Sequence, residues 1–183
     1  MTLPGWADGQ TVHDTDLLLR DAAINNLALI TTGANSGIKT AAPSAKALIN
    51  ASQSIANNTD TLVTMNTVAW DTDGMFNATN PFEFTVNTPG KYLVSIQTSW
   101  PPNATGMRAG KVYLNVNSNA ALISSSGVNA TVGGFDTIQT STAVWNAVAG
   151  DTVRFGVFQT SGGALNIQTA FGGTWMMVHR LTI

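Results

Sequence analysis

The sequence predicts a mainly β protein, an antiparallel sandwich or barrel, preceded by a short helical and extended segment. From Thr61 onward, apolar and polar residues alternate with a period of two, which places successive side chains on opposite faces of a strand. Pairs containing glycine, proline or asparagine interrupt these runs about every 8–15 residues, as between the strands of an antiparallel sheet. No helical pattern separates the strands, which excludes a parallel sheet built from βαβ units.

The first 30 residues are predicted to form an anchoring segment with a short helix. A Pro-Gly-Trp turn opens the chain, and Asp14 or Thr15 can cap a helix over residues 17–30. One face of this helix has apolar residues at helical spacing: Leu17, Ile24 and Leu27. A helix this short is marginal by itself and needs a partner. Residues 31–57 are small and polar, and we interpret them as a flexible linker, with one weak helix over residues 43–52 as the alternative.

About eight or nine short strands are predicted for the remainder of the chain. The clearest lie at residues 82–86, 92–96, 111–116, 153–157 and 174–183. The last of these is apolar on both faces, so one face can fill the sandwich while the other meets a protein partner. A symmetric oligomer explains this pattern.

The composition excludes several kinds of chemistry. The 183 residues include no cysteine, which excludes thiol catalysis, disulfides and cysteine-ligated metal sites. A net charge of −2 and a pI near 5.4 argue against a nucleic-acid-binding protein. The N-terminus lacks the basic and apolar regions of an export signal, and no apolar run approaches the roughly 18 residues of a membrane span. Thr, Asn and Ser occupy 25, 17 and 12 positions, which suits half-exposed strands and tight turns.

Two segments contain partial motifs for a cofactor or a metal. Residues 27–38 (Leu-Ala-Leu-Ile-Thr-Thr-Gly-Ala-Asn-Ser-Gly-Ile) are similar to the dinucleotide-binding turn of short-chain dehydrogenases, but Lys39 replaces the third glycine and no βαβ unit follows. Residues 71–74 (Asp-Thr-Asp-Gly) lack the further ligands of an EF-hand and are predicted to form a turn, although a calcium ion held between loops stays an open alternative. We therefore expect no cofactor and no metal site.

No catalytic arrangement of side chains is expected either. His13 lies in a polar stretch and His179 in an apolar strand, where a packed or interface histidine is the ordinary role. Glu83 has no second carboxylate at a spacing that suggests glycosidase chemistry. Five tryptophans are distinctive, since exposed aromatic rings can stack on sugars and buried ones pack in cores or interfaces. These observations predict a non-enzymatic protein with no catalytic residues.

Motifs in residues 58–183 follow one another in a recognisable order. They are residues 58–63 (Asn-Thr-Asp-Thr-Leu-Val), 70–76 (Trp-Asp-Thr-Asp-Gly-Met-Phe), 84–94 (Phe-Thr-Val-Asn-Thr-Pro-Gly-Lys-Tyr-Leu-Val), 149–153 (Ala-Gly-Asp-Thr-Val) and 158–162 (Phe-Gln-Thr-Ser-Gly), before the closing aromatic strand. Together they resemble the jelly roll of the C1q and tumour-necrosis-factor superfamily. The resemblance implies a homotrimer packed along a three-fold axis.

The N-terminus carries a different resemblance. Residues 3–12 (Leu-Pro-Gly-Trp-Ala-Asp-Gly-Gln-Thr-Val) and 15–21 (Thr-Asp-Leu-Leu-Leu-Arg-Asp) are similar to the opening of many tail and fibre proteins of tailed bacteriophages. This resemblance implies a virion protein that is made in the host cytoplasm and released by lysis.

These observations lead to the hypothesis of a homotrimeric phage structural protein: a tail fibre, a minor tail protein or a capsid-decorating fibre. Residues 1–30 would bind other virion proteins, and residues 58–183 would project as a head. The residues expected at the anchoring and subunit interfaces are Trp6, Leu17, Ile24, Leu27, Trp175 and Met177. Loops at residues 101–110 and 124–134 are the candidates for contact with a host surface protein or glycan, with mere decoration of the virion as the alternative. The alternatives are a lectin-like carbohydrate-binding module and a secreted C1q-like adhesion protein.

Overall fold

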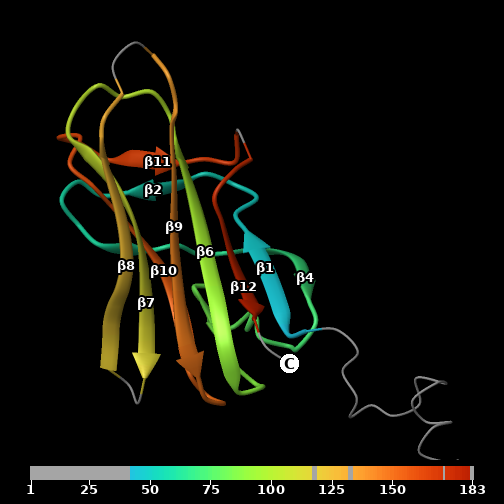
Figure 1. The fold of residues 1–183 in the computed structure, drawn as a ribbon. Coiled ribbons are helices and arrows are strands. Elements are labelled where there is room, and N and C mark those ends of the chain that lie inside the picture. The colour runs from blue at the N-terminus through green and yellow to red at the C-terminus, as the bar shows by residue number, and fades with distance from the viewer. Residues whose placement is uncertain (1–41, 117–118, 132–133, 171, 182–183) are drawn as a thin grey trace, which may run out of the picture. The chain divides into compact units, whose positions relative to one another are not determined.

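A computed structural model describes residues 42–116, 119–131, 134–170 and 172–181, which form twelve strands and no helix (Figure 1). The strands are β1 (Ser44–Leu48), β2 (Gln53–Ile55), β3 (Thr61–Leu62), β4 (Thr67–Asp71), β5 (Glu83–Thr85), β6 (Gly90–Trp100), β7 (Met107–Val116), β8 (Asn119–Asn129), β9 (Thr137–Ala147), β10 (Thr152–Gln159), β11 (Leu165–Ile167) and β12 (Trp175–Arg180). In this part of the chain, no helix is long and apolar enough to cross a membrane.

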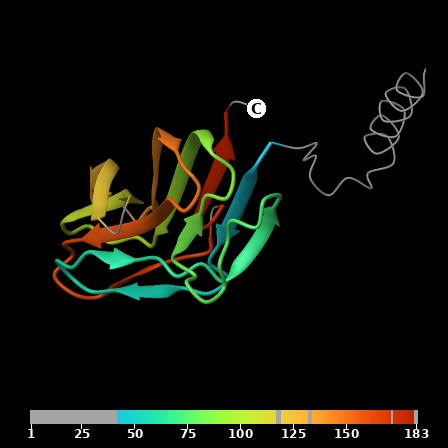
Figure 2. The ribbon, with the colours of Figure 1, turned by 90° about the horizontal axis from the view of Figure 1, so that it is seen from below.

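The strands form two main antiparallel sheets. The first, which we call the β12 sheet, has the order β4-β1-β12-β6-β9. The second, the β10 sheet, has the order β3-β10-β7-β8, and β5 also pairs with β10. A small third sheet pairs β11 with β2. Figures 1 and 2 show the layers from two directions. The prediction of an antiparallel sandwich is confirmed.

The core lies between the two main sheets. Alternate residues of β6 point into it, among them Tyr92, Val94 and Ile96, which are almost completely inaccessible to solvent. From the β10 sheet, Phe155 and Val112 meet them, and these two residues are direct cross-strand partners. The Tyr92 hydroxyl donates a 2.7 Å hydrogen bond to the carbonyl oxygen of Thr88, so its polar end is satisfied. Burial raises the pKa of Tyr92 above its ordinary value.

The prediction of a linker with a weak helix is wrong for residues 44–55, which form β1 and β2. β1 pairs with β12 on one side and with β4 on the other. Ala45 and Ala47 are fully buried, and the side chains between them are half-buried on the opposite side. Because the inward-facing residues of β1 are alanines, its alternating pattern resembles the small-residue composition of a linker. The compact unit accordingly runs from Ala41 to Ile183 and not from residue 58.

The five clearest predicted strands are confirmed, within a few residues, as β5, β6, β7, β10 and β12. The loops predicted at residues 101–110 and 124–134 are shorter than expected, because β7 begins at Met107 and β8 extends to Asn129. Short strands raise the total to twelve where about eight or nine were predicted. The predicted N-terminal helix lies outside the described residues.

Candidate functional site

The outward face of the β12 sheet contains two residues that the sequence predicted at an interface. Side chains alternate along β12, so Met176 and Val178 are buried in the core, while Trp175 and Met177 are half-buried on the other side. β12 is the middle strand of five. Met177 therefore lies near the centre of this face, and Trp175 lies on the same middle strand at its first residue.

Strand register defines the neighbours of these side chains. Met177 pairs with Lys46 of β1 on one side and with Ser95 of β6 on the other. Trp175 pairs with Leu48 of β1. Direct cross-strand partners point to the same side of a sheet, so all five side chains share the outward face.

A lysine lies between two tryptophans on this face. Lys46 pairs with Trp70 of β4, and its Nζ lies 5.7 Å from the centre of the Trp70 ring and 4.4 Å from that of Trp175. We call these three residues the tryptophan–lysine cluster. A cation over an aromatic face is stabilised by about 0.5–1 kcal/mol when exposed, and by more when water is removed. The two ring faces therefore hold the Lys46 ammonium group in place on this surface.

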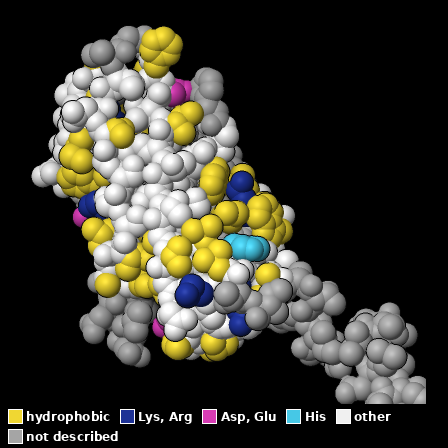
Figure 3. Space-filling model, in the orientation of Figure 1, with side chains coloured by type: hydrophobic (Ala, Val, Ile, Leu, Met, Phe, Trp, Pro, Cys, Tyr) yellow, Lys and Arg dark blue, Asp and Glu magenta, His cyan; other side chains and the backbone are white. Residues whose placement is uncertain are grey.

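The face carries very little negative charge. Asp71 is the one acidic residue in the five strands of the β12 sheet. Apolar side chains continue across the face, with Leu93 half-buried on β6 and Val144 exposed on β9. His179 of β12 pairs with Leu93, and Figure 3 shows hydrophobic side chains gathered beside basic ones on this side of the molecule. Such a mixed apolar and cationic surface suits protein contact better than catalysis.

The Asp71 carboxylate organises a loop of the chain. Its Oδ1 accepts hydrogen bonds from the backbone N–H groups of Asp73 and Met75, at 3.1 and 3.0 Å, and its Oδ2 accepts one from Phe76 at 2.8 Å. Residues 71–74 thus form the predicted turn, with Asp71 fastening it. Within the described ranges, no three His, Cys, Asp or Glu residues gather in a way that could hold a metal ion.

Glu83 is part of a structural ion pair. Its Oε2 accepts a 2.7 Å hydrogen bond from Arg154 Nε, and its Oε1 accepts one from Asn80 Nδ2 at 3.2 Å. The Glu83 side chain is only 7% exposed. This buried carboxylate links β5 to β10, so the one glutamate of the chain has a structural role.

A buried arginine holds the loop before β7. Arg108 is completely inaccessible, and its Nη1 donates 2.9 Å hydrogen bonds to the carbonyl oxygens of Thr105 and Met107. Its Nη2 donates to the carbonyl oxygen of Asn103 at 3.2 Å. Burial lowers the pKa of Arg108. The loop predicted to contact a host surface is therefore fixed from inside, and that contact stays a prediction.

The structure places the predicted interface residues unequally. It brings Trp175 and Met177 together on the β12-sheet face. The other four lie outside the described residues: Trp6, Leu17, Ile24 and Leu27. Sequence reasoning did not place Lys46 and Trp70 in an interface. The alternation within residues 44–48 is the signal that would have placed Lys46 outward, beside a tryptophan of the next strand.

Comparison with known proteins gives structural matches. No family model matches the chain, and no curated protein is detectably similar to it in sequence. Murine APRIL at pH 8.5 matches with a TM-score of 0.59 and 13% identity, over 76% of this chain and 98% of that chain.

Two further structures match over a similar extent. Eiger TNF from S. frugiperda has a TM-score of 0.56 and 12% identity, over 78% of this chain and 94% of that chain. The globular domain of the zebrafish complement 1qA protein has a TM-score of 0.52 and 15% identity, over 76% and 98%. At this level of identity the likeness shows the fold alone, and function must be argued from the residues of this chain.

Proposed function

Because the described residues form a C1q/TNF-like jelly-roll domain, we propose that the chain is a homotrimeric, non-enzymatic structural protein of a bacteriophage virion. The jelly roll is its projecting head. Residues 1–30 anchor the trimer to other virion proteins, at the tail or the capsid. The trimer and the virion role rest on different observations, so each has its own test.

The observation that carries the trimer is the β12-sheet face. Trp70 is 42% exposed and Val144 54% exposed in a single chain, on a face whose centre is Met177. A C1q/TNF-like fold typically assembles as a trimer, and the resemblance in sequence implies packing along a three-fold axis. Burial of these side chains between copies removes an apolar surface from water.

Three-fold assembly also fits the electrostatics of the face. A closed three-fold ring brings different patches of neighbouring copies together. Lys46 lies against Trp70 and Trp175, whose ring faces attract its ammonium group.

The virion role is supported by the N-terminal sequence alone. Residues 3–12 and 15–21 resemble the opening of tail and fibre proteins of tailed phages. In this proposal Trp6, Leu17, Ile24 and Leu27 are buried against a virion partner, and the protein reaches its final location by host lysis.

The trimer is tested by light scattering on the full chain after size exclusion. Met177→Asp places a charge at the centre of the proposed interface, and we expect it to shift the mass from three times to one times the 19.1 kDa chain. Leu122→Asp is the matched control, because Leu122 is 53% exposed and lies on β8 of the other sheet. A trimeric Met177→Asp variant would contradict the proposed interface.

The virion role is tested by deleting residues 1–40, which leaves the compact unit that begins at Ala41. The truncated chain should stay trimeric and be absent from purified particles, as measured by mass spectrometry. Incorporation equal to that of the full chain would contradict the anchoring role.

A further inference from the structure

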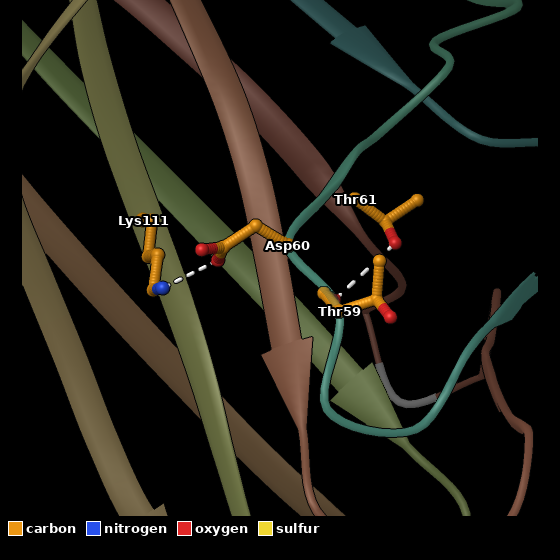
Figure 4. A network of polar contacts seen from close by, with 4 residues as sticks. All are labelled: Thr59, Asp60, Thr61 and Lys111. Carbon is orange, nitrogen blue, oxygen red and sulfur yellow. Dashed lines mark hydrogen bonds and ion pairs between the residues drawn. The ribbon is translucent and has the colours of Figure 1, made fainter.

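A depression lies on the outward face of the β10 sheet, in the layer opposite the proposed subunit interface. Its volume is about 170 Å³, and its lining consists of Asp60, Thr61, Leu62, Tyr113, Arg154 and Gly156. These residues come from β3, β7, β10 and the residue before β3. Figure 4 shows the Asp60 side chain reaching from this segment toward Lys111 on β7.

Gly156 lies at the bottom of the depression, in the middle of three strands, and its missing side chain leaves room for the Tyr113 ring. It pairs with Leu62 of β3 on one side and with Lys111 of β7 on the other. A Cβ atom at Gly156 would lie 2.7 Å from Cε2 of Tyr113, so the Tyr113 ring rests against the bare backbone of β10. The depression therefore has a backbone floor, an aromatic wall and an aliphatic wall.

Ion pairs hold the polar groups of the depression in place. Lys111 Nζ forms a hydrogen-bonded ion pair with Asp60 Oδ1 (Figure 4). Arg154 uses Nε to bind the buried Glu83. Among the described residues, the two terminal nitrogens of Arg154 make no hydrogen bond, so they are left for a ligand. Burial, with the Asp60 charge nearby, raises the pKa of Tyr113, whose hydroxyl stays a neutral hydrogen-bonding group.

The charges favour a neutral ligand. Asp60 is balanced by Lys111 and Arg154 by Glu83, so the site has no net charge. The polar groups that line the depression are the Asp60 carboxylate, the Arg154 guanidinium and the Tyr113 phenol, beside the Tyr113 ring and Leu62. This combination matches a molecule with hydroxyl groups around its edge and an apolar C–H face.

The volume limits the size of that molecule. Pockets for drug-sized ligands measure about 300–1,000 Å³, and the depression is smaller, at about 170 Å³. We propose that the depression binds one neutral pyranose unit of a glycan. The Tyr113 ring and Leu62 contact the sugar face, while Asp60 and Arg154 bind its hydroxyl groups. All lining residues come from one chain, so the site does not depend on the proposed trimer.

The test is saturation-transfer NMR on the full chain with the methyl glycosides of glucose, galactose and mannose, and with N-acetylglucosamine. At least one of these probes should bind with a Kd of roughly millimolar order, as expected for a ligand of this size. Asp60→Asn should weaken that binding by about tenfold, because it removes a charged acceptor and the ion pair that positions it. The Asp60 side chain is 58% exposed, so the variant should fold.

Asp136→Asn is the matched control, since it makes the same change outside the depression and should leave the Kd unchanged. Tyr113→Ala provides an independent variant that should also weaken binding. Circular dichroism and the native mass are measured on each sample, which separates lost binding from lost fold or assembly. Failure of all four sugars to bind overturns the proposal, as does binding that survives both Asp60→Asn and Tyr113→Ala. Preferential binding of free leucine would overturn the ligand class, because it would show a zwitterion site.

Discussion

Substitution of Gly106 by alanine should destabilise the domain strongly. Gly106 has a φ of +72°, and a Cβ atom there would lie 1.8 Å from the carbonyl oxygen of Thr160. Thr160 cannot move easily, because its N–H donates to the Met107 carbonyl at 3.1 Å and its Oγ1 accepts from the Met107 N–H at 2.9 Å. Alanine must therefore separate the start of β7 from the end of β10.

The magnitude follows from these contacts. The left-handed conformation costs alanine about 1–2 kcal/mol, and each of the two hydrogen bonds at Thr160 contributes about 1 kcal/mol. We expect Gly106→Ala to lower the free energy of unfolding by about 3–4 kcal/mol. Gly162→Ala is the matched control, since Gly162 has a φ of +89° but nothing within 4 Å of the added atom.

The assay is urea unfolding followed by tryptophan fluorescence, with both variants at the same protein concentration. The control should lose only about 1–2 kcal/mol. The difference of about 2 kcal/mol isolates the clash with Thr160. Equal losses in the two variants would refute the packing of the loop before β7 against the end of β10.

Two smaller effects follow from the hydrogen bonds of Asp71 and from the burial of Tyr92. Asp71→Asn should lower the free energy of unfolding by about 1–3 kcal/mol in the same urea assay, because an amide cannot accept hydrogen bonds at both positions. A chelator should leave the melting temperature of the wild-type protein unchanged, and a drop in that temperature would reveal a bound metal. The raised pKa of Tyr92 means that the folded state keeps a proton that the unfolded state loses near pH 10. The stability that protonated Tyr92 contributes should therefore be fully present below pH 10 and should be lost as the pH rises above it. If the Tm of a Tyr92→Phe variant fell as steeply with alkaline pH as that of the wild-type protein, Tyr92 would not be the source of the loss.

The sequence predicted the sheet layers because strand alternation is a local property. In β6 and β12 large apolar residues occupy one face, so the period of two is visible without tertiary information. The sequence of β1 predicts a linker because its inward residues are alanines, whose burial depends on strands distant in sequence. Burial of small residues is decided by packing and not by their own hydrophobicity.

The candidate sites were only partly predictable for the same reason. Trp175 and Met177 could be predicted because they lie in a long apolar strand. Lys46 could not, because only the pairing of β1 with β4 and β12 places it between two tryptophans. The depression on the β10 sheet depends on an absent side chain at Gly156 and on its register with Leu62. The register between strands distant in sequence is a long-range property, so it cannot be predicted from the composition of each strand alone.

The most direct test of the central claim is the native mass of the unmodified full chain, measured by light scattering across a range of protein concentrations. The claim that copies assemble through the β12-sheet face predicts three times the 19.1 kDa chain mass, stable on dilution. A mass equal to one chain at every concentration would contradict it.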